Sequence, residues 1–183
     1  MSAELSKVRV LLADGNAHMR TLVSSVLTAI GVGHVTECAD STEALDALNK
    51  TAVDIAIIEH RLSPIDGLEL ARRVRDAGAS AHAYLPIIML TGSVSRDLVL
   101  QARDAGINEF VAKPMTAQAL LNRLNAVIFR PRAFVKTADY FGPDRRRKQD
   151  ELYEGPWRRA EDADRPVVRT PPGAKALGRE TDA

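Results

Sequence analysis

Val8-Arg9-Val10-Leu11-Leu12-Ala13-Asp14-Gly15 is the stretch that decides the fold, because a nearly uninterrupted apolar run ends at a carboxylate. Half-exposed strands alternate apolar and polar residues, whereas a run of this kind is typical of a strand buried in a parallel sheet. Asn16 is a suitable helix cap, and apolar residues at helical spacing follow it as far as Gly31. The chain therefore begins with a buried strand followed by a helix.

The same alternation of strand and helix occurs four more times. The expected strands are 34–38, 54–58, 86–91 and 109–112, and the expected helices are 41–50, a segment after Asp66-Gly67, a segment around 98–105, and 116–128. Parallel strands need a crossover connection, so five such units predict an α/β fold with a doubly wound, five-stranded parallel sheet and helices on both faces. We expect this domain over residues 7–129.

Composition limits the class of protein. A chain of 183 residues can bury one core with some chain left over, and its net charge of +1 gives no reason to expect nucleic acid or a membrane as partner. Cys38 is the single cysteine, which excludes an internal disulfide. Neither a signal sequence nor a membrane-spanning apolar stretch is recognisable, so we expect a cytoplasmic protein.

Residues 130–183 have a different composition. They contain six of the nine prolines, 13 Lys/Arg against 10 Asp/Glu, and no apolar periodicity. This predicts an extended or disordered tail, able to order on a ligand. A Tyr-x-Gly-Pro-x-Arg-Arg motif occurs in it twice, 13 residues apart, at 140–146 and 153–159, and the second copy holds the only tryptophan, Trp157.

Polar side chains follow four of the expected strands: Asp14, Glu59, Thr91 and Lys113. Ligands of doubly wound sheets bind at the carboxyl ends of the strands, so we expect these side chains to form one site. Together with Lys113-Pro114 and the loop 62–67, they resemble the receiver domain of two-component response regulators, of the chemotaxis CheY type. The resemblance covers roughly residues 7–128.

The resemblance implies a role for each position. In receivers an acidic pair holds Mg²⁺, an aspartate accepts phosphate, a Thr or Ser and a Lys contact the phosphoryl group, and an aromatic residue reports the active state. Here the acidic pair is replaced by Asp14 and Gly15, the acceptor by Glu59, and the hydroxyl, lysine and aromatic positions hold Thr91, Lys113 and Phe110.

Gly15 and Glu59 depart from the receiver pattern. Asp66-Gly67, seven and eight residues after Glu59, supports this alignment. Mg²⁺ requires carboxylate oxygens in near-octahedral geometry, so a lost ligand and an added methylene are expected to weaken it severely. We therefore expect no metal and no ordinary aspartyl phosphorylation. Glu59 is expected to pair with Lys113 in a phosphate-independent state; neutral drift in an unused site is the alternative.

The repeated motif suggests a ligand. Gly permits close backbone approach, Pro restricts the turn, and guanidinium groups bind phosphate bidentately or pair with the O6/N7 edge of guanine. Tryptophan and tyrosine offer surfaces for base stacking. A cyclic dinucleotide presents two guanines and two phosphates, which matches two motif copies, while a solubilising linker or a non-specific anionic contact is the alternative.

A receiver followed by such a stretch resembles the Cle class of CheY-like cyclic di-GMP effectors, with the tail match over roughly residues 139–160. The resemblance implies that cyclic di-GMP binds the extension and promotes docking on the flagellar motor switch, which tunes motility or attachment. The expected ligand-binding residues are Tyr140, Arg145, Arg146, Arg147, Tyr153, Trp157, Arg158 and Arg159.

Two other functions remain open. One is a single-domain response regulator that accepts phosphate near Glu59 from a histidine kinase. The other is a nucleic-acid-binding regulator that uses the tail, although a net charge of +3 over residues 130–183 is a weak electrostatic footprint. An enzyme is not expected, because no nucleophile with its base and no phosphate-cradling glycine loop is recognisable.

Overall fold

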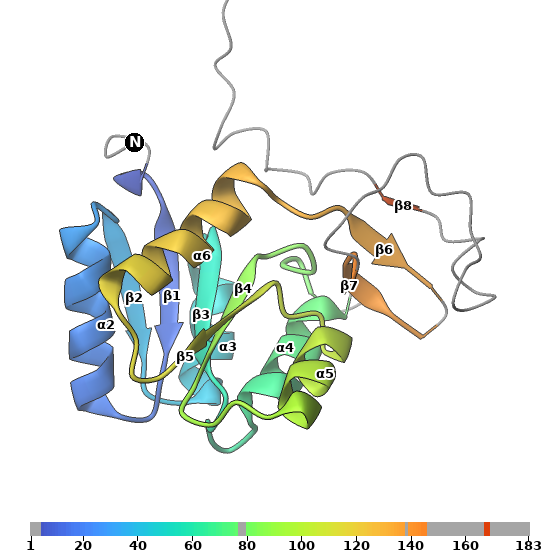
Figure 1. Cartoon of the computed structure of the whole chain (residues 1–183), viewed down its shortest axis with the longest axis horizontal. Helices are drawn as coiled ribbons and strands as arrows, with labels where there is room; N and C mark the ends of the chain where they lie inside the picture. The colour runs from blue at the N-terminus through green and yellow to red at the C-terminus, as the bar shows by residue number, and fades with distance from the viewer. Residues whose placement is uncertain (1–4, 77–79, 138, 146–166, 169–183) are drawn as a thin grey trace, which may run out of the picture.

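The computed structural model describes residues 5–76, 80–137, 139–145 and 167–168. Its elements follow the chain in the order β1 (Arg9–Ala13), α2 (Ala17–Ala29), β2 (His34–Cys38), α3 (Ser41–Lys50), β3 (Ile55–Glu59), α4 (Gly67–Arg75), β4 (Ile87–Thr91), α5 (Arg96–Asp104), β5 (Glu109–Ala112), α6 (Ala117–Phe129), β6 (Phe134–Lys136), β7 (Phe141–Pro143) and β8 (Val167–Val168) (Figure 1). The first five strands form a parallel sheet in the order β2-β1-β3-β4-β5, which confirms the predicted fold.

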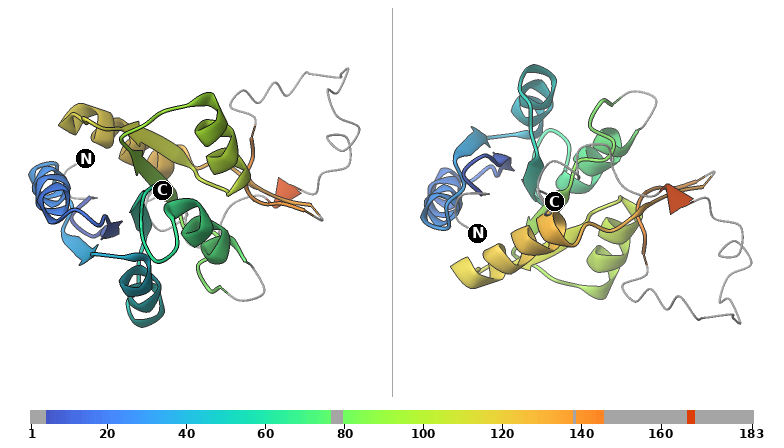
Figure 2. Two further views of the ribbon diagram at one scale, coloured as in Figure 1. Left: turned by 90° about the horizontal axis from the view of Figure 1, so that it is seen from below. Right: turned by 90° about the horizontal axis from the view of Figure 1, so that it is seen from above.

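Helices cover both faces of this sheet (Figure 2). On one face α3, α4 and α5 pack residues such as Val74 against the sheet, and on the other α2 and α6 supply Leu27 and Leu124. Successive strand side chains point to opposite faces, so Ile58 of β3 lies in the first core and Ile57 in the second. Two buried faces explain why the central strands are almost wholly apolar.

Side-chain caps define where the helices begin. Each helix is preceded by a residue whose side-chain oxygen accepts a backbone N–H of the first turn: Asn16, Asp40, Asp66, Ser95 and Thr116. The cap that the sequence predicted at Asn16 is confirmed. In the described parts of the chain, none of the helices combines the length and apolarity needed to cross a bilayer.

The first part of the predicted tail folds back onto the domain. β6 and β7 form an antiparallel hairpin beside α4 and α5, and β8 pairs with the other edge of β6 (Figures 1 and 2). Phe134 is 1% exposed, with its ring centroid 5.1 Å from that of Tyr84 and 5.6 Å from that of Phe141. This segment is extended, as predicted, but it is packed against the domain, so the folded unit continues past the expected boundary at residue 129.

Candidate functional site

The four polar residues expected at the carboxyl ends of the strands lie at the same edge of the sheet, and the side chains of Asp14, Glu59 and Lys113 contact one another. Glu59 and Thr91 are the last residues of β3 and β4, while Asp14 and Lys113 directly follow β1 and β5. Asp14 is 2% exposed and Glu59 7%, so both carboxylates need partners inside the protein. Phe110 lies in β5, partly buried against the core on the α3–α4–α5 face.

Lys113 joins the two carboxylates. Its Nζ lies 2.6 Å from Oδ2 of Asp14 and forms an ion pair with Oε2 of Glu59. Burial lowers the pKa of Lys113, but its hydrogen bonds with Asp14 and Glu59 outweigh this effect and raise the pKa above the ordinary lysine value. The lysine is therefore a protonated bridge at neutral pH, and the ion pair expected between Glu59 and Lys113 is present.

Backbone groups occupy other oxygens of the same carboxylates. Asp14 Oδ1 accepts the N–H of Asn16 at 2.9 Å, and Glu59 Oε1 accepts the N–H of Arg61 at 3.2 Å. Thr91 is engaged within its own loop, because its hydroxyl donates to the carbonyl of Ser93 at 2.9 Å and accepts the N–H of Ser93 at 3.2 Å. The site is thus closed by bonds from within the chain.

Two glycines beside the site, Gly15 and Gly67, differ in whether a Cβ would fit in their place. A Cβ at Gly67 would collide with the backbone carbonyl of Glu59. The helix α4 can therefore begin this close to β3 only with glycine at position 67. A Cβ at Gly15 would meet only the carbonyl oxygen of Ala39, at an ordinary 3.7 Å. Packing therefore does not require glycine at position 15, because a Cβ fits there in ordinary contact.

Two of the predicted ligand residues are described, and they lie together. The guanidinium of Arg145 stacks on Tyr140, 4.0 Å from the ring centroid, and its Nη2 lies 3.1 Å from Oδ1 of Asp104. The Tyr140 hydroxyl donates to the carbonyl of Pro143 at 2.8 Å. The other predicted ligand residues lie outside the part of the chain that the structure describes: Arg146, Arg147, Tyr153, Trp157, Arg158 and Arg159.

The sequence did not reveal the attachment of the hairpin. Arg75 of α4 is buried, and burial lowers its pKa to about 9. It donates to the carbonyls of Ala83, Leu85 and Gly106 and to Oδ1 of Asn108, with Phe134 over its guanidinium. Arg132 donates to the carbonyls of Ile107 and Asn108. The sequence held one signal for the burial of Arg75, because Arg75 follows Ala71 and Val74 at helical spacing on the buried face of α4.

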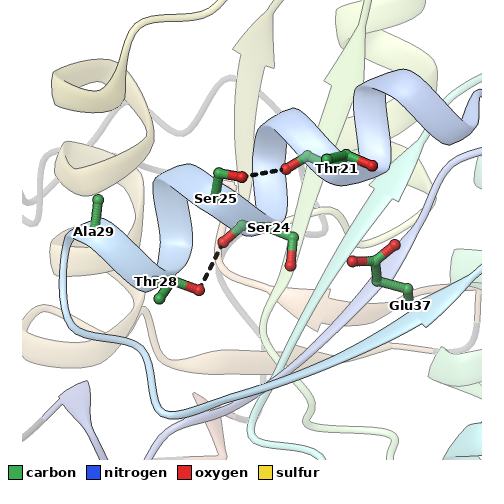
Figure 3. Close-up of a pocket in the computed structure, with 6 residues that line it drawn as sticks. All are labelled: Thr21, Ser24, Ser25, Thr28, Ala29 and Glu37. Carbon is green, nitrogen blue, oxygen red and sulfur yellow. Dashed lines mark hydrogen bonds between the residues drawn. The ribbon is translucent and has the colours of Figure 1, made fainter.

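A shallow hollow of about 440 Å³ lies between α2 and the edge strand β2 (Figure 3). Its hydroxyl groups are largely used within the helix, because Thr21, Ser25 and Thr28 donate to the carbonyls of Ala17, Thr21 and Ser24. Glu37, on its other side, lies 3.6 Å from the guanidinium of Arg20. We therefore do not regard this hollow as the functional site.

Comparison with known proteins supports the interpretation of the domain. The chain is 30% identical to the chemotaxis protein CheY of Pseudomonas aeruginosa over 67% of this chain and 98% of that protein. It is 32% identical to a CheY homolog of Campylobacter jejuni over 66% and 92%. Among solved structures, Vibrio cholerae CheY4 superposes with a TM-score of 0.61 at 28% identity, over 66% of this chain and 98% of that chain.

A further solved structure is the receiver domain of the sensor histidine kinase PA1611 from Pseudomonas aeruginosa, with a magnesium ion coordinated in its active-site cleft. It has a TM-score of 0.58 and 27% identity, over 64% of this chain and 94% of that chain. Residues 10–125 match the response regulator receiver domain. This chain therefore belongs to the response regulator receiver domain family.

Proposed function

We propose that this chain is a CheY-like signalling adaptor that works without phosphorylation. The observation that carries the proposal is the Lys113 bridge, which holds the carboxylates of both Asp14 and Glu59. A phosphoryl group would compete with these carboxylates for the same ammonium. Glu59 is in addition one methylene longer than the aspartate that accepts phosphate in receivers.

The same geometry argues against Mg²⁺ as a regular ligand of this chain. The two carboxylates that converge on the site already hold Lys113, and position 15 has no side chain to contribute. Within the described residues, no group of three or more His, Cys, Asp or Glu side chains is arranged to hold a metal ion. Mg²⁺ needs several oxygens in octahedral geometry, which two lysine-bound carboxylates do not supply.

The input that replaces phosphate is, in our proposal, cyclic di-GMP bound by the arginine-rich tail. Support comes from the first motif copy, where Tyr140 and Arg145 already form a stacked pair. A guanidinium on an aromatic ring is a suitable element for binding a guanine edge or a phosphate. The remaining expected ligand residues belong to 146–159 and complete the proposed binding segment.

The proposed output is docking through the surface of α5, β5 and α6 to a protein partner, the flagellar motor switch. Support comes from exposed apolar residues at and near α5, namely Val94 at 58% exposure, Val99 at 43% and Leu100 at 38%. Exposed apolar side chains grouped on one element are typical of protein-binding surfaces. Relatives named as chemotaxis proteins support a motility-related partner.

Calorimetry of the full chain tests the ligand assignment. Cyclic di-GMP is expected to bind with micromolar affinity, and GTP and a single-stranded oligonucleotide much more weakly. A variant ending at Arg145 keeps the hairpin strands β6 and β7 but is expected to lose binding. The absence of heat with cyclic di-GMP, or equal affinity for all three ligands, would refute the proposal. Retained binding by the shortened variant would refute the part of the proposed site that lies in residues 146–159.

A further inference from the structure

The guanidinium of Arg145 has a partner before any ligand arrives. It stacks on Tyr140 and forms an ion pair with Asp104, the last residue of α5, and its side chain is only 19% exposed. We call these three residues the Arg145 clasp. Asp104 comes from the domain, whereas Tyr140 and Arg145 come from the first motif copy.

The motif residues build the clasp. Gly142 is required because a Cβ there would lie 2.6 Å from the Tyr140 hydroxyl and 3.0 Å from Cα of Gly106. The backbone just before Arg145 is anchored too: the N–H of Asp144 donates to the carbonyl of Ala133 at 2.7 Å. The first motif copy thus directs Arg145 toward the end of α5.

Asp104 pairs with only part of the hydrogen-bond donors of the Arg145 guanidinium. The pair uses Nη2, while Nε of Arg145 is buried and has no hydrogen-bond partner among the described residues. Phosphate and the O6/N7 edge of guanine accept two guanidinium hydrogen bonds at once. A cavity of about 500 Å³ lies beside the other two members of the clasp: Asp104 and Tyr140 line it, together with Arg72, Lys136, Asp76 and Asp139.

We propose that Asp104 is an internal competitor that sets the affinity of the tail for its anionic ligand. This inference rests on the proposed function, since it concerns the same ligand. A ligand that captures Arg145 through Nε and Nη2 displaces the Asp104 carboxylate. The exchange removes Arg145 from Asp104 and leaves the carboxylate with the neighbouring Arg103, 3.2 Å from Oδ1, at the C-terminus of α5, where a negative charge is unfavourable to the helix. Ligand capture is thereby linked to the helix that carries Val99 and Leu100.

Calorimetry on full-length variants tests the competition. Asp104→Asn is expected to bind cyclic di-GMP about two- to fivefold more tightly than the wild type, as expected for loss of a partly exposed ion pair. Asp97→Asn, which removes the same charge from the first turn of α5, is the matched control and is expected to change affinity little. In a chain that already carries Arg145→Ala, adding Asp104→Asn is expected to leave the affinity for cyclic di-GMP unchanged. Equal affinities of the Asp104 and Asp97 variants, or a persistent gain without Arg145, would overturn the inference.

A ligand-free measurement separates the clasp from the proposed function. If Asp104 holds the hairpin through Arg145, Asp104→Asn raises the hydrogen-exchange rate of the Asp144 amide, and Asp97→Asn does not. An unchanged rate in Asp104→Asn would refute the clasp whatever the ligand. Absence of cyclic di-GMP binding by the wild type, with a raised exchange rate in Asp104→Asn, would instead refute the ligand and leave the clasp standing.

Discussion

Replacing Phe134 by alanine tests whether the hairpin belongs to the folded domain. Phe134 is 1% exposed and packs against the rings of Tyr84 and Phe141, which also contact each other, with the Arg75 guanidinium 5.2 Å from the Phe134 ring centroid. Truncating a fully buried phenylalanine costs about 3–5 kcal/mol, part of which is the loss of these aromatic contacts. Domains are stable by only about 5–15 kcal/mol, so the loss is easily measured.

Urea unfolding of the full chain, followed by far-ultraviolet circular dichroism, gives the free energy of unfolding. Phe129→Ala is the matched control, because Phe129 ends α6 at 39% exposure and its truncation is expected to cost less than about 1 kcal/mol. The hairpin can also open without global unfolding, so hydrogen exchange of the Asp144 amide, bonded to Ala133, completes the assay. Equal effects of the two substitutions in both measurements would refute the reasoning.

Three further predictions concern the receiver site and the core. Acetyl phosphate with Mg²⁺ is expected to leave the intact mass of the wild type unchanged, while Gly15→Asp with Glu59→Asp gains a phosphoryl adduct; an adduct on the wild type that Glu59→Gln abolishes would contradict this. Lys113→Met is expected to destabilise the chain by about 3–5 kcal/mol at pH 7, because it leaves two buried carboxylates uncompensated. The pKa of Lys113 is higher in the folded protein than in the unfolded chain, so its ion pairs contribute fully to the free energy of unfolding below the ordinary lysine pKa of about 10.4. This contribution is lost as the pH rises through the pKa of Lys113 in the folded protein. Urea titrations from pH 7 to 11 test this, and an equal alkaline loss in Lys113→Met would contradict it. Burial raises the pKa of Cys38 to about 11, so an aromatic disulfide reagent is expected to label it slowly in the folded protein and rapidly in urea, and equal rates would disprove the burial.

Much of the architecture could be predicted from the sequence, because apolar runs and helical spacing report local burial. The strand expected at 109–112 is β5 itself, and those expected at 54–58 and 86–91 differ from β3 and β4 by one residue at their ends. The hairpin was not predicted. Its strands have only three residues each, too few for an alternating pattern, and the surrounding sequence is rich in charges and proline.

Local patterning was enough to establish the strand–helix units and the polar residues at the strand ends, because both depend on near neighbours in the chain. Tertiary folding determined what those polar residues contact. Lys113 reaches Asp14 across 99 positions, and Arg145 meets Asp104 only because the hairpin docks on α5. Such contacts depend on how separate elements pack together, and no periodicity within either element encodes them. The Lys113 bridge in the receiver site and the Arg145 clasp are both contacts between separate elements.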